Sequence, residues 1–281
     1  MPSQRTARSI SSAAVTDGLG RTVHLATPPR SIVSLVPSLT EALFAMGLSE
    51  QIAGRTKYCV EPADQVDNTP ALGGTKDPDI RRIIDMQPDL VIASAEENVR
   101  EHVEVLIAAG LTVYVSLPST VRRAIAELHD LAALANRIPE AAPWLTEAAA
   151  LVQRFEDRTK HRRPLRYFCP IWRRPYMVAA PDTYMSDLLR LCGGENIFTG
   201  GAAHYYPVEL DEVARRAPEV ILLPSEPYPF AAKHLPEIVA WNQIPAVQTR
   251  SVHLIDGQWI TWYGPRIASS LRAVAALFES A

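Results

Sequence analysis

Apolar residues in the first half of the chain alternate between short continuous runs and helical spacing. The runs at residues 31–36, 89–93 and 111–116 are typical of buried strands. Between them, segments 79–86, 97–109 and 119–136 carry apolar residues three or four positions apart, which predicts amphipathic helices. Ser38 and Glu41 have the spacing of a capping box, which predicts a further helix running to Gly47. Strands separated by helices indicate a mostly parallel sheet.

The second half of the chain repeats this pattern. Residues 165–169, 219–223 and 252–255 are strand-like, and residues 183–191, 209–216 and 265–280 are helix-like. The segments Ile80–Ile92 and Leu210–Leu222 share one order of features: an amphipathic helix, a proline, an acid and an apolar strand. This internal repeat indicates two similar α/β lobes.

A long helix is predicted between the halves. Residues 139–161 begin with proline, are rich in Ala, Leu and Glu, and contain no glycine. At 1.5 Å per residue this helix would be about 35 Å long. We therefore predict an α/β fold of two similar lobes with mostly parallel sheets, joined by one long rigid α-helix. The expected boundaries are 17–137 for the first lobe, 138–163 for the helix and 164–281 for the second lobe.

Charge and composition narrow the range of partners. The 281 residues carry a net charge of −3 with no long basic or acidic run, which argues against nucleic acid and anionic membranes as partners. No stretch is apolar enough for membrane insertion, and residues 1–17 lack the apolar segment of a secretory signal. These features predict a cytoplasmic location, with an extracytoplasmic one as the alternative if a leader precedes this sequence.

Motifs for catalysis and metal binding are missing from the sequence. There is no GxGxxG after a strand, no GxxxxGK[ST] and no GxSxG, so a non-catalytic protein is favoured over a two-lobed enzyme such as a glycosyltransferase. The three cysteines form no CxxC pair and the seven histidines form no HExxH. His204, beside Tyr205 and Tyr206, is the one candidate axial ligand. We therefore expect no metal bound by the protein itself and no intrinsic cofactor.

Several segments resemble a known family. They are Arg30–Gly47 (RSIVSLVPSLTEALFAMG), Lys57–Pro62 (KYCVEP), Pro88–Ala93 (PDLVIA), Leu188–Phe198 (LLRLCGGENIF) and Gly264–Ala268 (GPRIA). Their order and spacing resemble the helical-backbone periplasmic binding proteins, which include vitamin B12, ferric-siderophore and haem receptors. The resemblance begins near Asp17 and looks closest to the vitamin B12 branch. It implies a monomeric substrate-binding protein of the ABC-importer type that holds a metal-containing ligand between its lobes. Cobalamin or another corrinoid is expected first, and a ferric chelate next.

Ligand contacts are expected on loops that follow strands and face the crevice between the lobes. The tracts IWRRPY and WITWYGPR place rings beside guanidinium groups, and this combination suits an aromatic chelate with anionic groups. Rings that seal the lobe core, a Glu97 that caps a helix and a buried Cys59 thiol are the structural alternatives. The candidates are Pro37, Ser38, Tyr58, Cys59, Lys76 and Glu97 in the first lobe, and Trp172, Arg173, Tyr205, Tyr206, Glu226, Trp262, Tyr263 and Arg266 in the second.

Two positions bear on the expected ABC permease. The resemblance implies one exposed glutamate on each lobe that pairs with a permease arginine. At these positions this chain has Arg81 and Asp211. Because a guanidinium at residue 81 would repel a permease arginine, a cytosolic sensor or carrier of corrinoids or iron chelates is the alternative.

Overall fold

The computed structural model describes residues 12–200 and 203–280, which form two compact units. The first unit comprises residues 12–117 and 126–143, and the second comprises residues 118–125 and 144–280. Most of the N-terminal segment that led to the prediction of a cytoplasmic location lies outside the described residues. Within the described part of the chain, no helix combines the length and the apolar character needed to cross a membrane.

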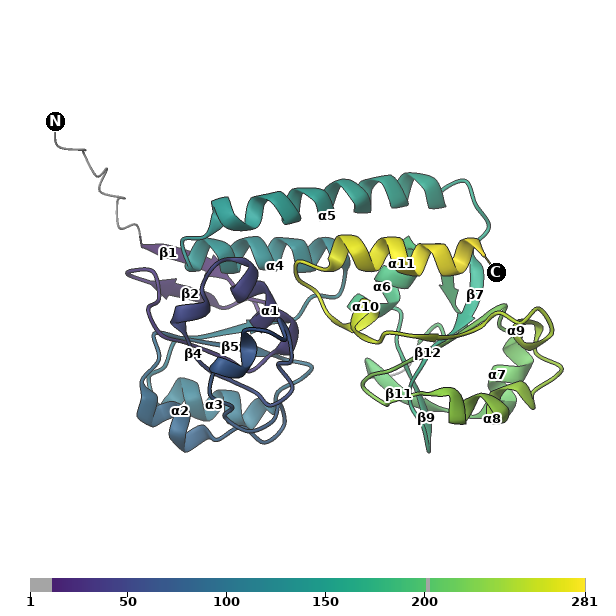
Figure 1. Ribbon diagram of the computed structural model, residues 1–281, viewed down its shortest axis with the longest axis horizontal. Coiled ribbons are helices and arrows are strands. Elements are labelled where there is room, and N and C mark those ends of the chain that lie inside the picture. Colours follow the sequence, from purple (N-terminus) through teal and green to yellow (C-terminus); the bar gives the residue numbers. More distant parts are fainter. Residues whose placement is uncertain (1–11, 201–202, 281) are drawn as a thin grey trace. The chain divides into compact units, whose positions relative to one another are not determined.

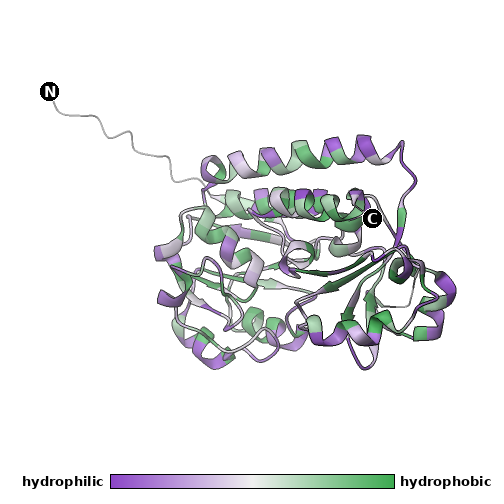
Figure 2. Ribbon diagram, turned by 45° about the vertical axis from the view of Figure 1, so that its right-hand side comes forward, coloured by the Kyte–Doolittle hydropathy of each residue, from purple (hydrophilic) through white to green (hydrophobic). Residues whose placement is uncertain are grey.

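A four-stranded parallel sheet forms the centre of the first unit (Figure 1). Its strands, in the order β4-β3-β5-β6, are β4 (Ile52–Arg55), β3 (Ile32–Ser34), β5 (Leu90–Ser94) and β6 (Val113–Ser116). Helices α2 (Ile80–Met86) and α3 (Arg100–Ala108) bury Ile83, Val103 and Leu106 against it. Strand arrows in Figure 2 are largely green, the colour of hydrophobic residues. Every residue of β3, β5 and β6 is buried, so both faces of the sheet are covered, and this explains why these strands are continuous apolar runs in the sequence.

Two predicted helix starts in this unit are wrong. Helix α1 (Pro37–Ala45) has Val36 as its N-cap without a side-chain hydrogen bond, so Ser38 and Glu41 form no capping box. Helix α3 begins at Arg100, and Glu97 does not cap it. The Asn98 side chain holds the preceding turn instead, because it accepts from the Ser94 amide (2.8 Å) and donates to the Thr75 carbonyl (2.9 Å).

The second unit contains a sheet of the same design. Its parallel strands, in the order β10-β7-β12-β13, are β10 (Gly194–Asn196), β7 (Leu165–Phe168), β12 (Val220–Pro224) and β13 (Val252–Ile255). Around it lie α6 (Tyr184–Leu191), α7 (Leu210–Arg216), α8 (Leu235–Val239), α9 (Pro245–Gln248), α10 (Gln258–Thr261) and α11 (Ile267–Glu279). In both parallel sheets the strand that is second in chain order lies at the edge beside the first, and the third and fourth strands follow on the other side. The predicted α/β fold with two similar units and mostly parallel sheets is confirmed.

The sequence repeat corresponds to a repeated local structure. Gln87 and Ala217 end α2 and α7 in the left-handed conformation, both with a φ of 47°, and a proline follows each. The acid after that proline fastens the start of the neighbouring strand. Asp89 accepts from the Arg30 and Ser31 amides (2.8 and 3.0 Å), and Glu219 accepts from the Arg166 amide (3.1 Å).

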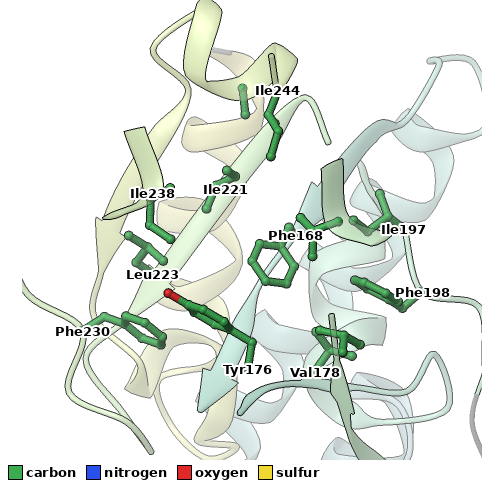
Figure 3. Close-up of a cluster of buried hydrophobic side chains, with 13 residues drawn as sticks. Phe168, Tyr176, Val178, Ile197, Phe198, Ile221, Leu223, Phe230, Ile238 and Ile244 are labelled. Atoms are coloured by element: carbon green, nitrogen blue, oxygen red, sulfur yellow. The ribbon is translucent and has the colours of Figure 1, made fainter. Parts of the chain in front are cut away.

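The sequence pattern did not predict two antiparallel sheets. A hairpin joins β1 (Ala13–Thr16) to β2 (Thr22–Leu25), and a three-stranded sheet has the order β11-β9-β8. Its strands are β11 (Tyr205–Val208), β9 (Tyr176–Ala179) and β8 (Pro170–Trp172), so Trp172, Tyr205 and Tyr206 lie on strands and not on loops. The sheet contributes Tyr176 and Val178 to a core with Phe168 and Phe198 (Figure 3).

Helices α4 (Val121–Leu134) and α5 (Ile138–Thr159) both cross the boundary between the units. Helix α5 is continuous over 22 residues, or about 33 Å, which confirms the long helix and shortens its predicted end by two residues. Helix α4 is a second connection. Its first amide, at Val121, donates to Asp187 of α6 (2.8 Å), and further along the helix Glu127 accepts from Ser116 of β6 (2.6 Å).

Candidate functional site

The carboxyl ends of the parallel strands form one rim in each unit. Open α/β sheets bind ligands at this edge, because the loops there converge. We call residues 56–79 and 95–99 the first rim, and residues 170–176, 225–234 and 256–266 the second rim. Most of the predicted contact residues lie on these two rims.

Tyr58 is the exposed aromatic residue of the first rim. Its side chain is 53% exposed, and the Lys57 ammonium lies 5.2 Å from the ring centroid. Lys76 donates to the Glu96 carbonyl at 2.9 Å and so joins the loop after β4 to the loop after β5. Glu97 lies half-buried in the turn after β5. The first rim therefore presents one free ring face held by a braced loop.

Cys59, Pro37 and Ser38 are buried inside the first unit, as the structural alternative for Cys59 expected. The Cys59 sulfur lies 3.1 Å from Thr40 Oγ1 and 3.2 Å from Thr56 Oγ1. Burial raises the pKa of the Cys59 thiol, with hydrogen bonds from the two threonines acting in the opposite direction. This thiol is a structural group beneath the loop that carries Tyr58.

Trp172 is the exposed aromatic residue of the second rim. It is 45% exposed at the end of β8, and its ring meets Tyr228 edge to face at a centroid distance of 5.6 Å. Tyr228 is in turn backed by Phe230 and His234, at 4.8 and 5.5 Å. Trp172 is thus supported on one side and open on the other.

Arg173, next to Trp172, is bound within the unit. Its Nε (3.1 Å) and Nη2 both donate to Glu237, and the Tyr176 hydroxyl donates to the same carboxylate at 2.6 Å. The guanidinium fork that was expected to meet an anionic ligand group therefore holds the β8–β9 hairpin to α8.

Glu226 and Arg266 come together after β12 and β13. The Thr261 hydroxyl donates to Glu226 at 2.7 Å, and Arg266 donates to Gln258 at 2.7 Å. The Arg266 guanidinium lies 4.8 Å from the Trp262 ring centroid. Burial raises the pKa of Glu226. Thr261 and Gln258 were not among the predicted site residues. The only sequence signal for them is that both lie on one turn of a short helix between Asp256 and Trp262.

The remaining aromatic candidates of the second unit are more enclosed than expected. Trp262 and Tyr263 are each 5% exposed, and Tyr263 packs against Tyr184 at 5.3 Å, so these rings seal the unit as in the structural alternative. Tyr205 and Tyr206 are half-buried on β11. Tyr206 packs against the core cluster of Figure 3.

Histidine and acidic side chains do not converge at these rims. His204 Nε2 lies 3.6 Å from an Asp182 carboxylate oxygen. Within residues 12–200 and 203–280, no three His, Cys, Asp or Glu side chains gather as they would around a metal ion.

Two further features lie apart from the rims. Arg81 and Asp211 are both exposed, and each is the second residue of its helix, α2 or α7, in the repeated part of the fold. An open hollow of about 670 Å³ lies at the end of α5 beside β10. Its cations Lys160, Arg162, Arg163 and Arg190 are paired with carboxylates of the same unit.

The fold defines a two-unit α/β protein with loops gathered at one sheet edge in each unit, and comparison with known proteins identifies its family. A family model described as periplasmic binding protein matches residues 32–259, so the chain belongs to that family. Vitamin B12-binding proteins of Vibrio campbellii and Vibrio cholerae serotype O1 are 26% and 28% identical over 258 and 261 residues. These alignments cover 90% of this chain and 90% or 91% of the relative.

Solved structures share the fold. The periplasmic vitamin B12 binding protein BtuF of Vibrio cholerae has a TM-score of 0.75 at 24% identity, with 90% of this chain and 98% of that chain covered. The periplasmic heme-binding protein BhuT gives 0.77 at 24% identity with the same coverage. A periplasmic binding protein from Veillonella parvula gives 0.80 at 16% identity, covering 98% and 99%. The relatives are binding proteins, so this chain is a substrate-binding protein and not an enzyme.

Proposed function

We propose that this chain is a receptor for a ligand that brings its own metal, with a corrinoid as the first candidate and haem or a ferric chelate as the next. The observation that carries the proposal is the exposed Trp172 ring at the second rim, held edge-on by Tyr228. A flat organic ligand gains most from such a surface, because the ring already has a defined position and loses little entropy on binding. The similarity to vitamin B12-binding proteins over 90% of the chain ranks the corrinoid first.

Tyr58 supports the same proposal from the first unit. Its ring is exposed on the braced loop after β4 and can meet a second flat or apolar edge of a ligand. The arrangement of a ligand between the two lobes stays a prediction.

Absorbance spectroscopy tests the proposed function. Purified protein is mixed with cyanocobalamin, hemin and a ferric catecholate siderophore in turn, passed through a desalting column and scanned. We expect one chromophore to elute with the protein at about one equivalent per chain. If none of the three is retained and equilibrium dialysis detects no binding at micromolar concentrations, the proposal is refuted.

The transport partner is a separate part of the proposal. We infer that this chain docks poorly to a permease that carries arginines against both units, because Arg81 is exposed on α2 while Asp211 is exposed on α7. A carrier that works without a permease fits Arg81 better. The cytoplasmic location predicted above stays a prediction, and fractionation of cells that express the tagged full-length gene product would test it.

A further inference from the structure

The Glu226 carboxylate is held in a fixed position at the second rim. Thr261 donates to its Oε1 at 2.7 Å, and Gly257 packs so closely that a Cβ there would lie 2.5 Å from Glu226 Cγ. Any other residue at position 257 would therefore displace this side chain. The loop after β13 thus presses on the loop after β12, and the carboxylate has little freedom to move.

The hydrogen-bond donors to Glu226 are neutral groups. They are the Thr261 hydroxyl and the side chain of Trp262, and both stabilise the ionised form less than a cation would. Burial and the negative charge of Asp256 raise the pKa of this carboxyl, whereas Arg266 lowers it. A further hydrogen-bond donor supplied by a ligand would stabilise the carboxylate.

Two cations of the same rim, Arg173 and Arg266, have partners within the protein. Arg173 donates twice to Glu237, and Arg266 donates to Gln258 while its guanidinium lies over Trp262. A carboxylate or catecholate on the ligand would have to break one of these arrangements to pair with Arg173 or Arg266. It would also meet the like charge of Glu226 in a partly desolvated place, where repulsion is stronger than in water.

We infer that Glu226 selects the ligand by the chemistry of the ligand's edge, favouring neutral N–H or O–H donors and disfavouring anionic oxygens. This inference rests on the proposed function, because it concerns the ligand of that same site. It makes Glu226 a specificity-determining residue, and it places an amide-bearing macrocycle ahead of one with free carboxylates.

Matched ligands test the inference. Mild hydrolysis of cyanocobalamin converts one peripheral amide into a carboxylic acid, and the separated monocarboxylates differ from the parent in that group alone. Their affinities for the full-length protein are measured by isothermal titration calorimetry at pH 7 and compared with those of cyanocobalamin and hemin. We expect at least one monocarboxylate to bind tenfold or more weakly than the parent, and hemin to bind more weakly than cyanocobalamin.

The isosteric variant Glu226→Gln assigns the effect to this residue. In Glu226→Gln the affinities for the parent and for the monocarboxylate should differ by no more than about threefold. Glu195→Gln, an exposed carboxylate of the same unit on β10, should keep the wild-type ratio. If every monocarboxylate binds wild-type protein as tightly as the parent, or if Glu226→Gln keeps the full ratio, the inference is overturned.

The outcomes also separate this inference from the proposed function. Binding of hemin in preference to cyanocobalamin overturns the selection by Glu226 but leaves the proposed receptor function standing. Failure to bind cyanocobalamin, hemin and the ferric catecholate siderophore overturns both.

Discussion

Replacement of Trp172 by alanine measures how much the exposed ring contributes to ligand binding. The side chain is 45% exposed, and a tryptophan of this kind can bury up to about 250 Å², so a stacked ligand would cover roughly 100 Å² more. At about 25 cal/mol per Å² this area is worth about 2.5 kcal/mol. Trp172→Ala should therefore weaken binding by about 60-fold.

The assay is isothermal titration calorimetry with the probe that wild-type protein retains. Loss of the edge-to-face contact with Tyr228 should cost about 0.5–1.5 kcal/mol of folding stability, so urea unfolding is measured in parallel. Val239→Ala on α8, where the side chain is 48% exposed, is the matched control and should bind normally. A change of less than threefold in Trp172→Ala, with the protein folded, would show that the ligand does not stack on this ring.

The remaining predictions concern stability, thiol chemistry and docking. Arg163 lowers the pKa of Glu219 to about 2, so the stabilisation is complete above pH 4.5 and is lost as the pH falls toward 2. Glu219→Gln should lower the free energy of unfolding by about 1–2 kcal/mol at pH 7 and by much less at pH 3. The value at pH 7 is smaller than the pKa shift alone would give, because Arg163 is largely exposed and solvent screens the ion pair. Urea denaturation at both pH values checks this, and an unchanged difference would contradict it. Cys59 and the two other cysteines are buried, so native protein should react slowly with a thiol reagent, whereas urea-unfolded protein should react with three equivalents of the reagent per chain. Rapid labelling of native protein that Cys59→Ser abolishes would contradict the buried position of this thiol. Arg81→Glu should strengthen binding to an arginine-bearing permease of this family by about tenfold, whereas equal binding of wild type and variant would show that residue 81 does not face the permease.

The sequence predicted the parts of the fold that depend on local pattern. The runs that became β3, β5 and β12 are buried on both faces, so their apolar character is continuous and easily recognised. Strand β8 has three residues and begins with Pro170, and its hairpin turn holds Arg174 with a φ of 66°, so no period-2 signal was available there.

The sequence predicted where the candidate site residues lie in the fold better than it predicted how exposed their side chains are. Trp172 and Trp262 look alike in the sequence, since each lies in a tract of arginine, proline and tyrosine. One is 45% exposed and the other 5%, because Trp262 follows α10 into the core while Trp172 ends an edge strand. Likewise the Arg173 fork binds Glu237, which is 64 residues away and cannot be identified from sequence spacing.

The capping of α4 by Asp187 limits how this protein can be dissected. A truncated gene that stops after residue 137 would still encode Val121 and the first turn of α4 but would lose the carboxylate that accepts from it. The complementary fragment would keep Asp187 and lack the segment 118–125 that belongs with it. Domain-swap chimaeras with related receptors should therefore exchange residues 118–125 together with the rest of the second unit. A chimaera made with a single crossover point would separate these residues from that unit.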